Sequence, residues 1–289
     1  MARHLQSHAF TKKRRIQMWL KSIVGIFIVI CVTYFVSWCM HSSFLMIEDV
    51  QVFGADQDIT DSIRTLALND LTANYIGILP RANSLIYPRQ QIVSDITANF
   101  IQVLDVHVDR DGMRHLRISV NEKTPSAVVC TVLPDFDDNQ VLTNISNTDS
   151  CYFADDSGLL FEKSSLNSNH VYPVYYAPTV VSLGTTTDFV GTHATSTDEF
   201  VMLQKAYKNV QTIGMPVDAM LIKDAGEYEL YSSSTVIYFD DTAHVPDEIA
   251  NLIAFLGRII SEDRTQKKST VFDYIDLRYG SNVFYKIIK

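Results

Sequence analysis

The longest uninterrupted apolar stretch of the chain covers residues 22–40, nineteen residues without a charged side chain. At a helical rise of 1.5 Å per residue, this stretch is about 28 Å long, close to the roughly 30 Å hydrocarbon core of a bilayer. Six Lys and Arg residues precede it, and no acidic residue occurs before Glu48. We therefore predict a transmembrane helix over 22–40, a basic cytoplasmic tail over 1–21, and a remainder on the outer side of the membrane.

A cleaved signal peptide is the main alternative to an anchor, because it also begins with basic residues and continues into an apolar stretch. The stretch here is longer than the apolar region of a typical signal peptide. Residues 34–40 are bulky and aromatic, where a cleavage site needs small side chains. The pattern therefore favours a retained anchor over a signal peptide, and also over a buried core helix.

Residues 44–124 alternate between strand-like and helix-like patterns, and together they predict one βααββ unit. The expected elements are a strand over 44–53, a short helix capped at 59–61, a helix over 89–100, and strands over 102–109 and 113–121. The two helices are connected by a loop with turn residues, and Gly54 ends the first strand.

The turn between the last two strands sets their register. A two-residue Asp-Gly turn would place valines of the first strand opposite Arg117 and His115. A three-residue loop at 111–113 instead gives one continuous apolar face, so we favour it, with Gly112 left-handed and His107 and His115 turned away from that face. The pairs that this loop predicts are Val108 with Leu116, Val106 with Ile118, and Leu104 with Val120.

Residues 125–289 are β-rich, and two helices interrupt the strands. Strands are expected at 127–132, 151–153, 159–161, 172–176, 219–223, 227–231, 236–239, 272–279 and 283–288. Helices are expected from 196–198 to 214 and over 246–262. We therefore predict an α+β fold with one N-terminal transmembrane helix, a βααββ domain over 44–124, and a mixed β-rich domain with two helices over 125–289. The polar segment 134–150 is expected to be a mobile loop.

The charge balance limits the classes of ligand. Without the six basic residues of the tail, the remainder has 18 Lys and Arg and 33 Asp and Glu, so its formal net charge is −15. This excess of negative charge argues against nucleic acid, or an anionic lipid surface, as the main ligand.

The four cysteines divide between the two sides of residue 40. Cys31 and Cys39 lie in the predicted anchor, whereas Cys130 and Cys151 lie outside it. Two cysteines in an oxidising compartment are a candidate disulfide, and these two enter short strands at either end of 131–150. Two separate buried thiols remain the alternative, because spacing alone does not prove contact.

The sequence contains none of the short motifs that identify common catalytic or cofactor sites. His-Glu-x-x-His, Cys-x-x-Cys, Gly-x-Ser-x-Gly, Gly-x-Gly-x-x-Gly and the phosphate-binding loop are all absent. The acidic residues near 135–138 and 155–156 lack the spacing of a calcium loop. We expect no catalytic, cofactor-binding or metal-binding residues, and hence a protein that is not an enzyme.

Four stretches resemble the FtsQ/DivIB family of bacterial cell-division proteins, in the same order along the chain. The first, 44–54, is similar to the opening strand of that family's POTRA domain, a module named for polypeptide transport. The second, 118–127, is similar to its closing strand, with Lys123 in place of the usual Arg. The others are 155–161, similar to an Asp-x-x-Gly-x-x-Phe turn, and 274–279, similar to the signature before the last strand. Cys130 stands near a position that is aromatic in many members.

This resemblance implies a scaffold in the divisome, with a POTRA domain followed by a β domain that binds the small FtsB/FtsL or DivIC/FtsL pair. It also implies a type II protein of the inner (plasma) membrane, concentrated at the division septum. A terminal strand often lies at a sheet edge, where it can accept a strand from another chain. The residues that we expect to bind the partner at this edge are Arg278, Tyr279, Ser281, Val283 and Tyr285.

Within that set, Tyr279 is expected to anchor the partner and Arg278 to pair with a carboxylate on it. Two other classes of protein remain open. A POTRA-bearing transport or envelope-sensor protein would share the first domain, and a membrane-anchored envelope enzyme would require a polar pocket.

Overall fold

The structure, a computed structural model, describes residues 7–75, 79–134, 150–164, 171–178, 188–223, 226–240, 245–266 and 270–288. The chain divides into two compact units, Met1–Glu122 and Lys123–Lys289. This division lies two residues before the expected one at 124/125. Almost all of the predicted mobile loop 134–150 lies outside the described residues.

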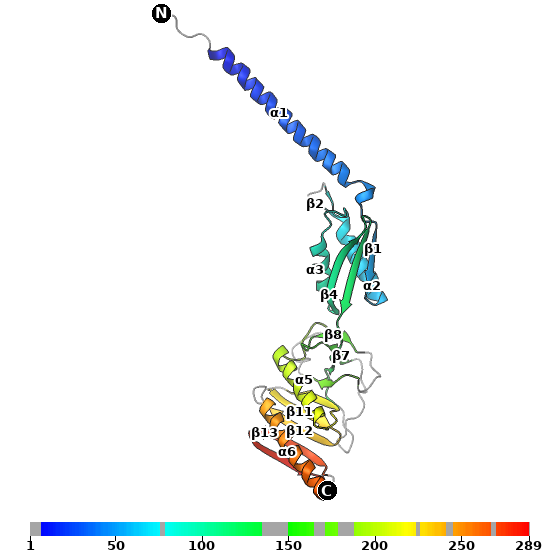
Figure 1. Cartoon of the computed structure of the whole chain (residues 1–289), viewed down its shortest axis with the longest axis vertical. Helices are drawn as coiled ribbons and strands as arrows, with labels where there is room; N and C mark the ends of the chain where they lie inside the picture. The colour runs from blue at the N-terminus through cyan, green and yellow to red at the C-terminus, as the bar shows by residue number, and fades with distance from the viewer. Residues whose placement is uncertain are drawn as a thin grey trace, which may run out of the picture. The chain divides into compact units, whose positions relative to one another are not determined.

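The chain begins with one long helix, α1 (Ser7–Met40) (Figure 1). Its segment Met18–Met40 is long and apolar enough to cross a membrane, and none of its residues is buried within the protein. Trp19 and Trp38 lie near the two ends of this segment and are exposed, in the positions that aromatic residues take at the two faces of a bilayer. The helix begins before residue 22 because no proline interrupts 7–21 and Lys and Arg are good helix formers.

The rest of the first unit contains two helices packed on a three-stranded sheet. The elements are η1 (Ser43–Leu45), β1 (Asp49–Phe53), α2 (Gln57–Thr72), β2 (Asn74–Tyr75), β3 (Leu79–Pro80), α3 (Arg89–Asn99), β4 (Val103–Asp111) and β5 (His115–Glu122). The sheet order is β1-β5-β4, with β1 parallel and β4 antiparallel to β5. Apart from the small β2–β3 hairpin, this is the predicted order of strand, helix, helix, strand and strand.

A single apolar core joins the sheet of this unit to its helices. Ile63 and Ala67 of α2 and Ile92 and Ile96 of α3 are fully buried. They pack against the inward-facing residues of the strands, which include Val50, Val106, Val108, Leu116, Ile118 and Val120. The spacing of four residues within each helix places both members of each pair on the face toward the sheet.

Of the boundaries in this unit that differ from the prediction, two are at the starts of β1 and α2. β1 begins only at Asp49, because 43–45 form a short 3-10 turn after the long helix. α2 begins at Gln57 rather than after the predicted cap at 59–61. Thr60 is already inside this helix, since its N–H donates to the Asp56 carbonyl at 2.8 Å and its hydroxyl to Ala55.

The β4–β5 hairpin has the predicted apolar face but not the predicted loop. Val108 pairs with Ile118 rather than with Leu116, so the three-residue loop is 112–114 instead of 111–113. Gly112 is left-handed as predicted, with a φ of 79°. A shift of two residues keeps every side chain on its face, so His107 and His115 are exposed as expected.

One residue of this hairpin lies on the wrong face. The prediction placed Leu104 in the core opposite Val120, but its side chain is 66 % exposed. A register irregularity between Val103 and Asp105 turns Leu104 out of the sheet, and Val120 pairs with Val106 instead.

The second unit is built on a large mixed sheet, in which nine strands pair within the described residues. The strands are β6 (Ala127–Cys130), β7 (Cys151–Ala154), β8 (Leu160–Lys163), β9 (Val174–Tyr176), β10 (Ala219–Ile222), β11 (Glu227–Ser232), β12 (Thr235–Asp240), β13 (Phe272–Tyr279) and β14 (Asn282–Ile287). Their order is β14-β13-β12-β11-β10-β9-β6-β7-β8. β9 is shorter than predicted, because Pro173 has no N–H to extend the ladder.

Helices α5 (Thr197–Thr212) and α6 (Val245–Gln266) cover one face of this sheet (Figure 1). The predicted N-terminus of α5 is correct, since the Ser196 side chain accepts a hydrogen bond from the Glu199 N–H. The core between helices and sheet is apolar, and it includes Phe200, Leu203, Ile249 and Leu252. α6 continues four residues past the predicted end at 262.

On the other face of the sheet, Cys130 and Cys151 form a disulfide between β6 and β7. The two residues are directly opposed in the register. The Thr131 N–H donates to the Ser150 carbonyl, so the next pair along, the cysteines, takes the position without cross-strand hydrogen bonds. Because Cα atoms are closest at such positions, the two are only 4.0 Å apart, less than the 4.4–6.8 Å usual for disulfides.

Candidate partner-binding edge

The hairpin of β13 and β14 ends the large sheet. The two strands pair antiparallel and are connected by the turn 280–281, in which Ser281 is exposed. The Asn251 side chain of α6 donates to the Gly280 carbonyl at 3.1 Å and so holds this turn to the helix. β14 has β13 as its only neighbour in the sheet order. Within the described residues, one side of β14 is therefore an open edge.

The backbone groups along this edge alternate in direction. The Ile288 N–H donates to the Val271 carbonyl, which places the even-numbered N–H groups of β14 toward β13. By the same alternation, the backbone N–H and C=O groups of Val283, Tyr285 and Ile287 face outward. These outward groups are the ones that an added strand would pair with.

The opposite end of the sheet is less accessible. There β8 is the last strand, but a neighbouring segment covers part of its outer side. The Leu160 N–H donates to the Thr192 carbonyl at 2.8 Å, and the Leu160 carbonyl accepts from the Gly191 N–H at 2.7 Å. Of the two ends, the β14 edge is thus the better acceptor for a strand.

Two exposed aromatic side chains lie side by side at the turn end of this edge. Tyr279 is 59 % exposed and Phe284 is 52 % exposed. Their rings make an edge-to-face contact with centroids 5.2 Å apart. Tyr279 was predicted from the sequence, whereas Phe284 was not, although Phe284 directly precedes Tyr285 in the same strand. Large, exposed aromatic rings that pack against each other are typical of residues that anchor a partner at an interface.

Two of the predicted binding residues also have a structural role. Val283 is partly buried against the core of the second unit. The Tyr285 ring packs on Phe255 and Phe272, with centroids 4.9 and 5.7 Å away. Substituting either side chain would therefore remove packing contacts of the hairpin, so a test at these positions needs a control for packing.

Arg278 already has a carboxylate partner within its own strand. Its guanidinium makes two hydrogen bonds to the Asp276 carboxylate, at 2.9 and 2.8 Å, and lies 5.2 Å from the centre of the Tyr238 ring. Burial raises the pKa of Asp276, but the hydrogen bonds from the Arg278 side chain and N–H outweigh it and keep the pKa below its ordinary value. Arg278 is thus already paired, and contact with a partner carboxylate would have to compete with Asp276.

Neither similarity to known proteins nor the grouping of possible metal ligands assigns a chemistry to the described residues. Among the residues that the structure describes, no three His, Cys, Asp or Glu side chains are grouped so that they could hold a metal ion. No protein-family model matches the chain, and no curated protein sequence matches it. The open edge of β14 is therefore the feature on which a functional proposal rests.

Proposed function

We propose that this chain is a non-enzymatic scaffold of the bacterial cell-division machinery, of the FtsQ/DivIB type. In this proposal α1 anchors the protein in the inner membrane with its N-terminus in the cytoplasm, and the first unit is a POTRA domain. The second unit binds a small single-pass division protein of the FtsB/FtsL or DivIC/FtsL kind. The observation that carries the proposal is the open β14 edge with its exposed pair Tyr279 and Phe284.

Three further observations support this assignment. The four family-like stretches occur in order behind one helix that is long and apolar enough to span a membrane. The strand and helix order of the first unit is the one that the resemblance implies. The basic tail precedes the apolar helix, which favours a cytoplasmic N-terminus.

The proposed binding mode is strand addition. An extended segment of the partner pairs with the outward backbone groups of β14. Those hydrogen bonds supply affinity that does not depend on the amino-acid sequence of the partner. Selectivity comes from side chains, chiefly the rings of Tyr279 and Phe284 on the sheet face opposite α6. Ser281, in the turn beside them, adds a polar contact at the rim.

Imaging in dividing cells tests the proposal. A fluorescent protein fused to the N-terminus of the chain should concentrate at midcell in the source organism before constriction. A control fusion of residues 1–46 alone should spread evenly through the membrane, because it has the anchor but neither unit. Even distribution of the full chain would contradict the division role and favour an envelope-sensor or transport protein, and activity on cell-wall material would favour an enzyme.

A further inference from the structure

The loop 83–87 of the first unit is tied to the end of α1. The Asn83 side chain donates to the Met40 carbonyl at 2.8 Å, and the Ser84 N–H donates to the Leu45 carbonyl at 2.8 Å. Met46 and Asn83 also form an isolated β-bridge. Because Met40 is the last residue of the membrane-length segment, these bonds keep the loop next to the place where the chain leaves a bilayer.

Asn83 and Ser84 are polar but almost completely buried, at 0 % and 1 % exposure. Both side chains have hydrogen-bond partners. The side-chain amide oxygen of Asn83 accepts from the Leu85 N–H, and the Ser84 hydroxyl contacts the Met113 sulfur at 3.9 Å. The same two residues therefore hold three segments together, namely the turn after α1, the loop itself and the tip of the β4–β5 hairpin.

Each of these three segments exposes one large apolar side chain. Phe44 is 67 % exposed, Leu85 52 % and Met113 42 %. Leu85 follows Ser84 in the chain, and Met113 contacts the Ser84 hydroxyl. Phe44 directly precedes Leu45, whose carbonyl accepts from the Ser84 N–H. Single exposed apolar residues are common on any surface, but three from separate segments, gathered at the end of a membrane-length helix, form a group that fits an apolar environment.

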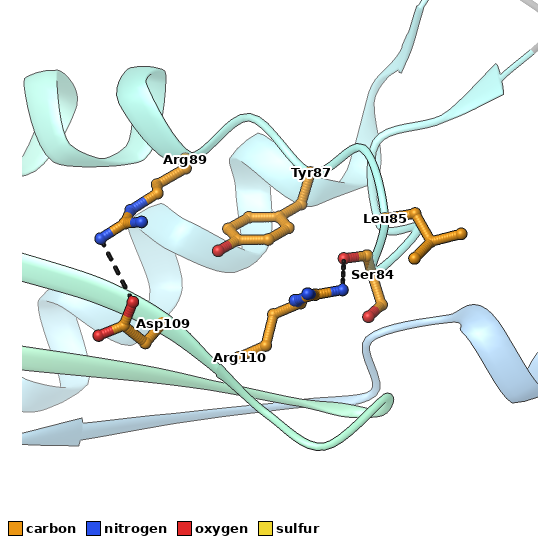
Figure 2. Close-up of a pocket in the computed structure, with 6 residues that line it drawn as sticks. All are labelled: Ser84, Leu85, Tyr87, Arg89, Asp109 and Arg110. Atoms are coloured by element: carbon orange, nitrogen blue, oxygen red, sulfur yellow. Dashed lines mark hydrogen bonds and ion pairs between the residues drawn. The ribbon is translucent and has the colours of Figure 1, made fainter.

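A shallow open cleft of about 620 Å³ lies beside this group, lined by Ser84, Leu85, Tyr87, Arg89, Asp109 and Arg110 (Figure 2). Arg89 is paired with Asp109 at 3.3 Å. The Arg110 guanidinium has a different partner, since it donates to the Ser84 backbone carbonyl at 3.2 Å. In Figure 2, Leu85 points away from the Arg89–Asp109 pair. The cleft thus presents one arginine that no carboxylate of the described residues neutralises through a salt bridge.

We infer that this end of the first unit is seated on the surface of the phospholipid bilayer that α1 spans. Phe44, Leu85 and Met113 enter the interfacial layer, and Arg110 binds a lipid phosphate. Arginine suits this role because its planar guanidinium forms paired hydrogen bonds with phosphate oxygens. The acidic balance of the whole remainder does not oppose the contact, because only this one end meets the membrane.

The inference rests on the membrane span that we propose for α1, but not on the division role. The bilayer then fixes the orientation of the first unit, and the residues farthest from the loop, such as Leu104 at the other end of β4, point away from the membrane. Leu104 is also a large exposed apolar residue, at 66 %. It is therefore a matched control for Leu85.

Tryptophan quenching in nanodiscs tests this contact on the full chain. The sequence has two tryptophans, Trp19 and Trp38, so Trp19→Phe with Trp38→Phe gives a background without this fluorophore. A single reporter is then added as Leu85→Trp or as Leu104→Trp, in phosphatidylcholine nanodiscs with a nitroxide on a fraction of the headgroups. We expect quenching at position 85 to be at least twofold stronger than at position 104.

Removing the arginine separates the phosphate contact from the general position of the loop. Arg110→Gln should at least halve the quenching at position 85, whereas Arg64→Gln, which removes an exposed arginine already paired with Asp49, should not change it. Equal quenching at positions 85 and 104, or quenching at 85 that Arg110→Gln leaves unchanged, overturns the proposal. Unquenched Trp19 and Trp38 in the unmodified chain would instead contradict the span of α1, and the docking with it.

Discussion

At the scale of single residues, the Cys130–Cys151 disulfide is the strongest local constraint in the second unit. Both cysteines are buried, in a small apolar cluster on the sheet face opposite the helices. The bond closes a loop with a sequence separation of 21 residues. A loop of this length restricts the unfolded chain enough to contribute about 3 kcal/mol to stability.

We therefore predict that replacing both cysteines by alanine lowers the free energy of unfolding by about 3 kcal/mol. Urea denaturation of the full chain in detergent, followed by circular dichroism, measures this change. The control replaces the two free cysteines of α1, Cys31 and Cys39, by serine and should leave the midpoint of the second unit where it was. An unchanged midpoint in the double alanine variant would show that the bond adds nothing to stability.

The roles of some residues could be predicted from the sequence, and the roles of others were missed for identifiable reasons. The cysteine pair followed from two strands at the ends of one polar segment, and Gly112 from the need for one apolar face. The partner of Arg278 was missed although the signal was there. Asp276 and Arg278 are two apart in a strand, so they share a face, and an arginine beside a carboxylate on one face pairs with it.

At the scale of elements, two left-handed glycines differ in what surrounds them. Gly54, after β1, has a φ of 88°, and a Cβ there would lie 2.3 Å from the Val120 carbonyl oxygen of β5. Gly112, in the hairpin loop, has a φ of 79° but nothing within 4 Å of such a Cβ. The first glycine therefore allows two strands to approach, whereas the second only allows a turn.

This difference predicts unequal costs for the same substitution. Gly112→Ala should destabilise the first unit by about 1 kcal/mol, the cost of a left-handed alanine. Gly54→Ala should cost about 3 kcal/mol, because the backbone of β5 must also move. Denaturant melts of both variants give the comparison, and equal losses would mean that the close approach of Gly54 to β5 is not maintained in solution.

Most elements were predictable because their apolar residues recur at a regular period, as in α3, α5 and β5. Their boundaries were less predictable where a single residue or hydrogen bond, rather than the period, decided them. The start of α2 depends on backbone bonds to 55–56, the exposure of Leu104 on an irregularity in β4, and the length of β9 on Pro173. None of these features changes the spacing of the apolar residues, from which the elements were predicted.

At the scale of the whole molecule, each unit has its own apolar core, so binding surfaces on one unit are testable without unfolding the other. The proposed functions are also separate. In these proposals the first unit binds lipid, and the second binds a protein partner through the β14 edge. The open edge could not be derived from composition, because it depends on the order of strands in the sheet, which comes from long-range pairing.

Strand addition at the β14 edge can be tested with the partner that the proposed function names, the extracytoplasmic segment of the FtsB- or DivIC-type protein from the same organism. Tyr279→Ala should weaken binding by about 1–2 kcal/mol, because it removes one ring of the exposed pair. Val283→Pro should weaken it more, since the Val283 N–H faces outward and proline removes that donor while the hydrogen bonds to β13 remain. Isothermal titration calorimetry of the full chain in nanodiscs measures both effects.

Val283→Ala is the matched control for the proline variant, because it removes the same side chain contacts but keeps the N–H. If strand addition is the binding mode, the alanine variant binds nearly as well as the parent chain and only the proline variant fails. If both lose affinity equally, the side chain of Val283 and the packing of the hairpin matter, and the backbone does not. Unchanged affinity in folded Tyr279→Ala and Val283→Pro would move the binding surface away from β14, to the first unit or to another face of the sheet.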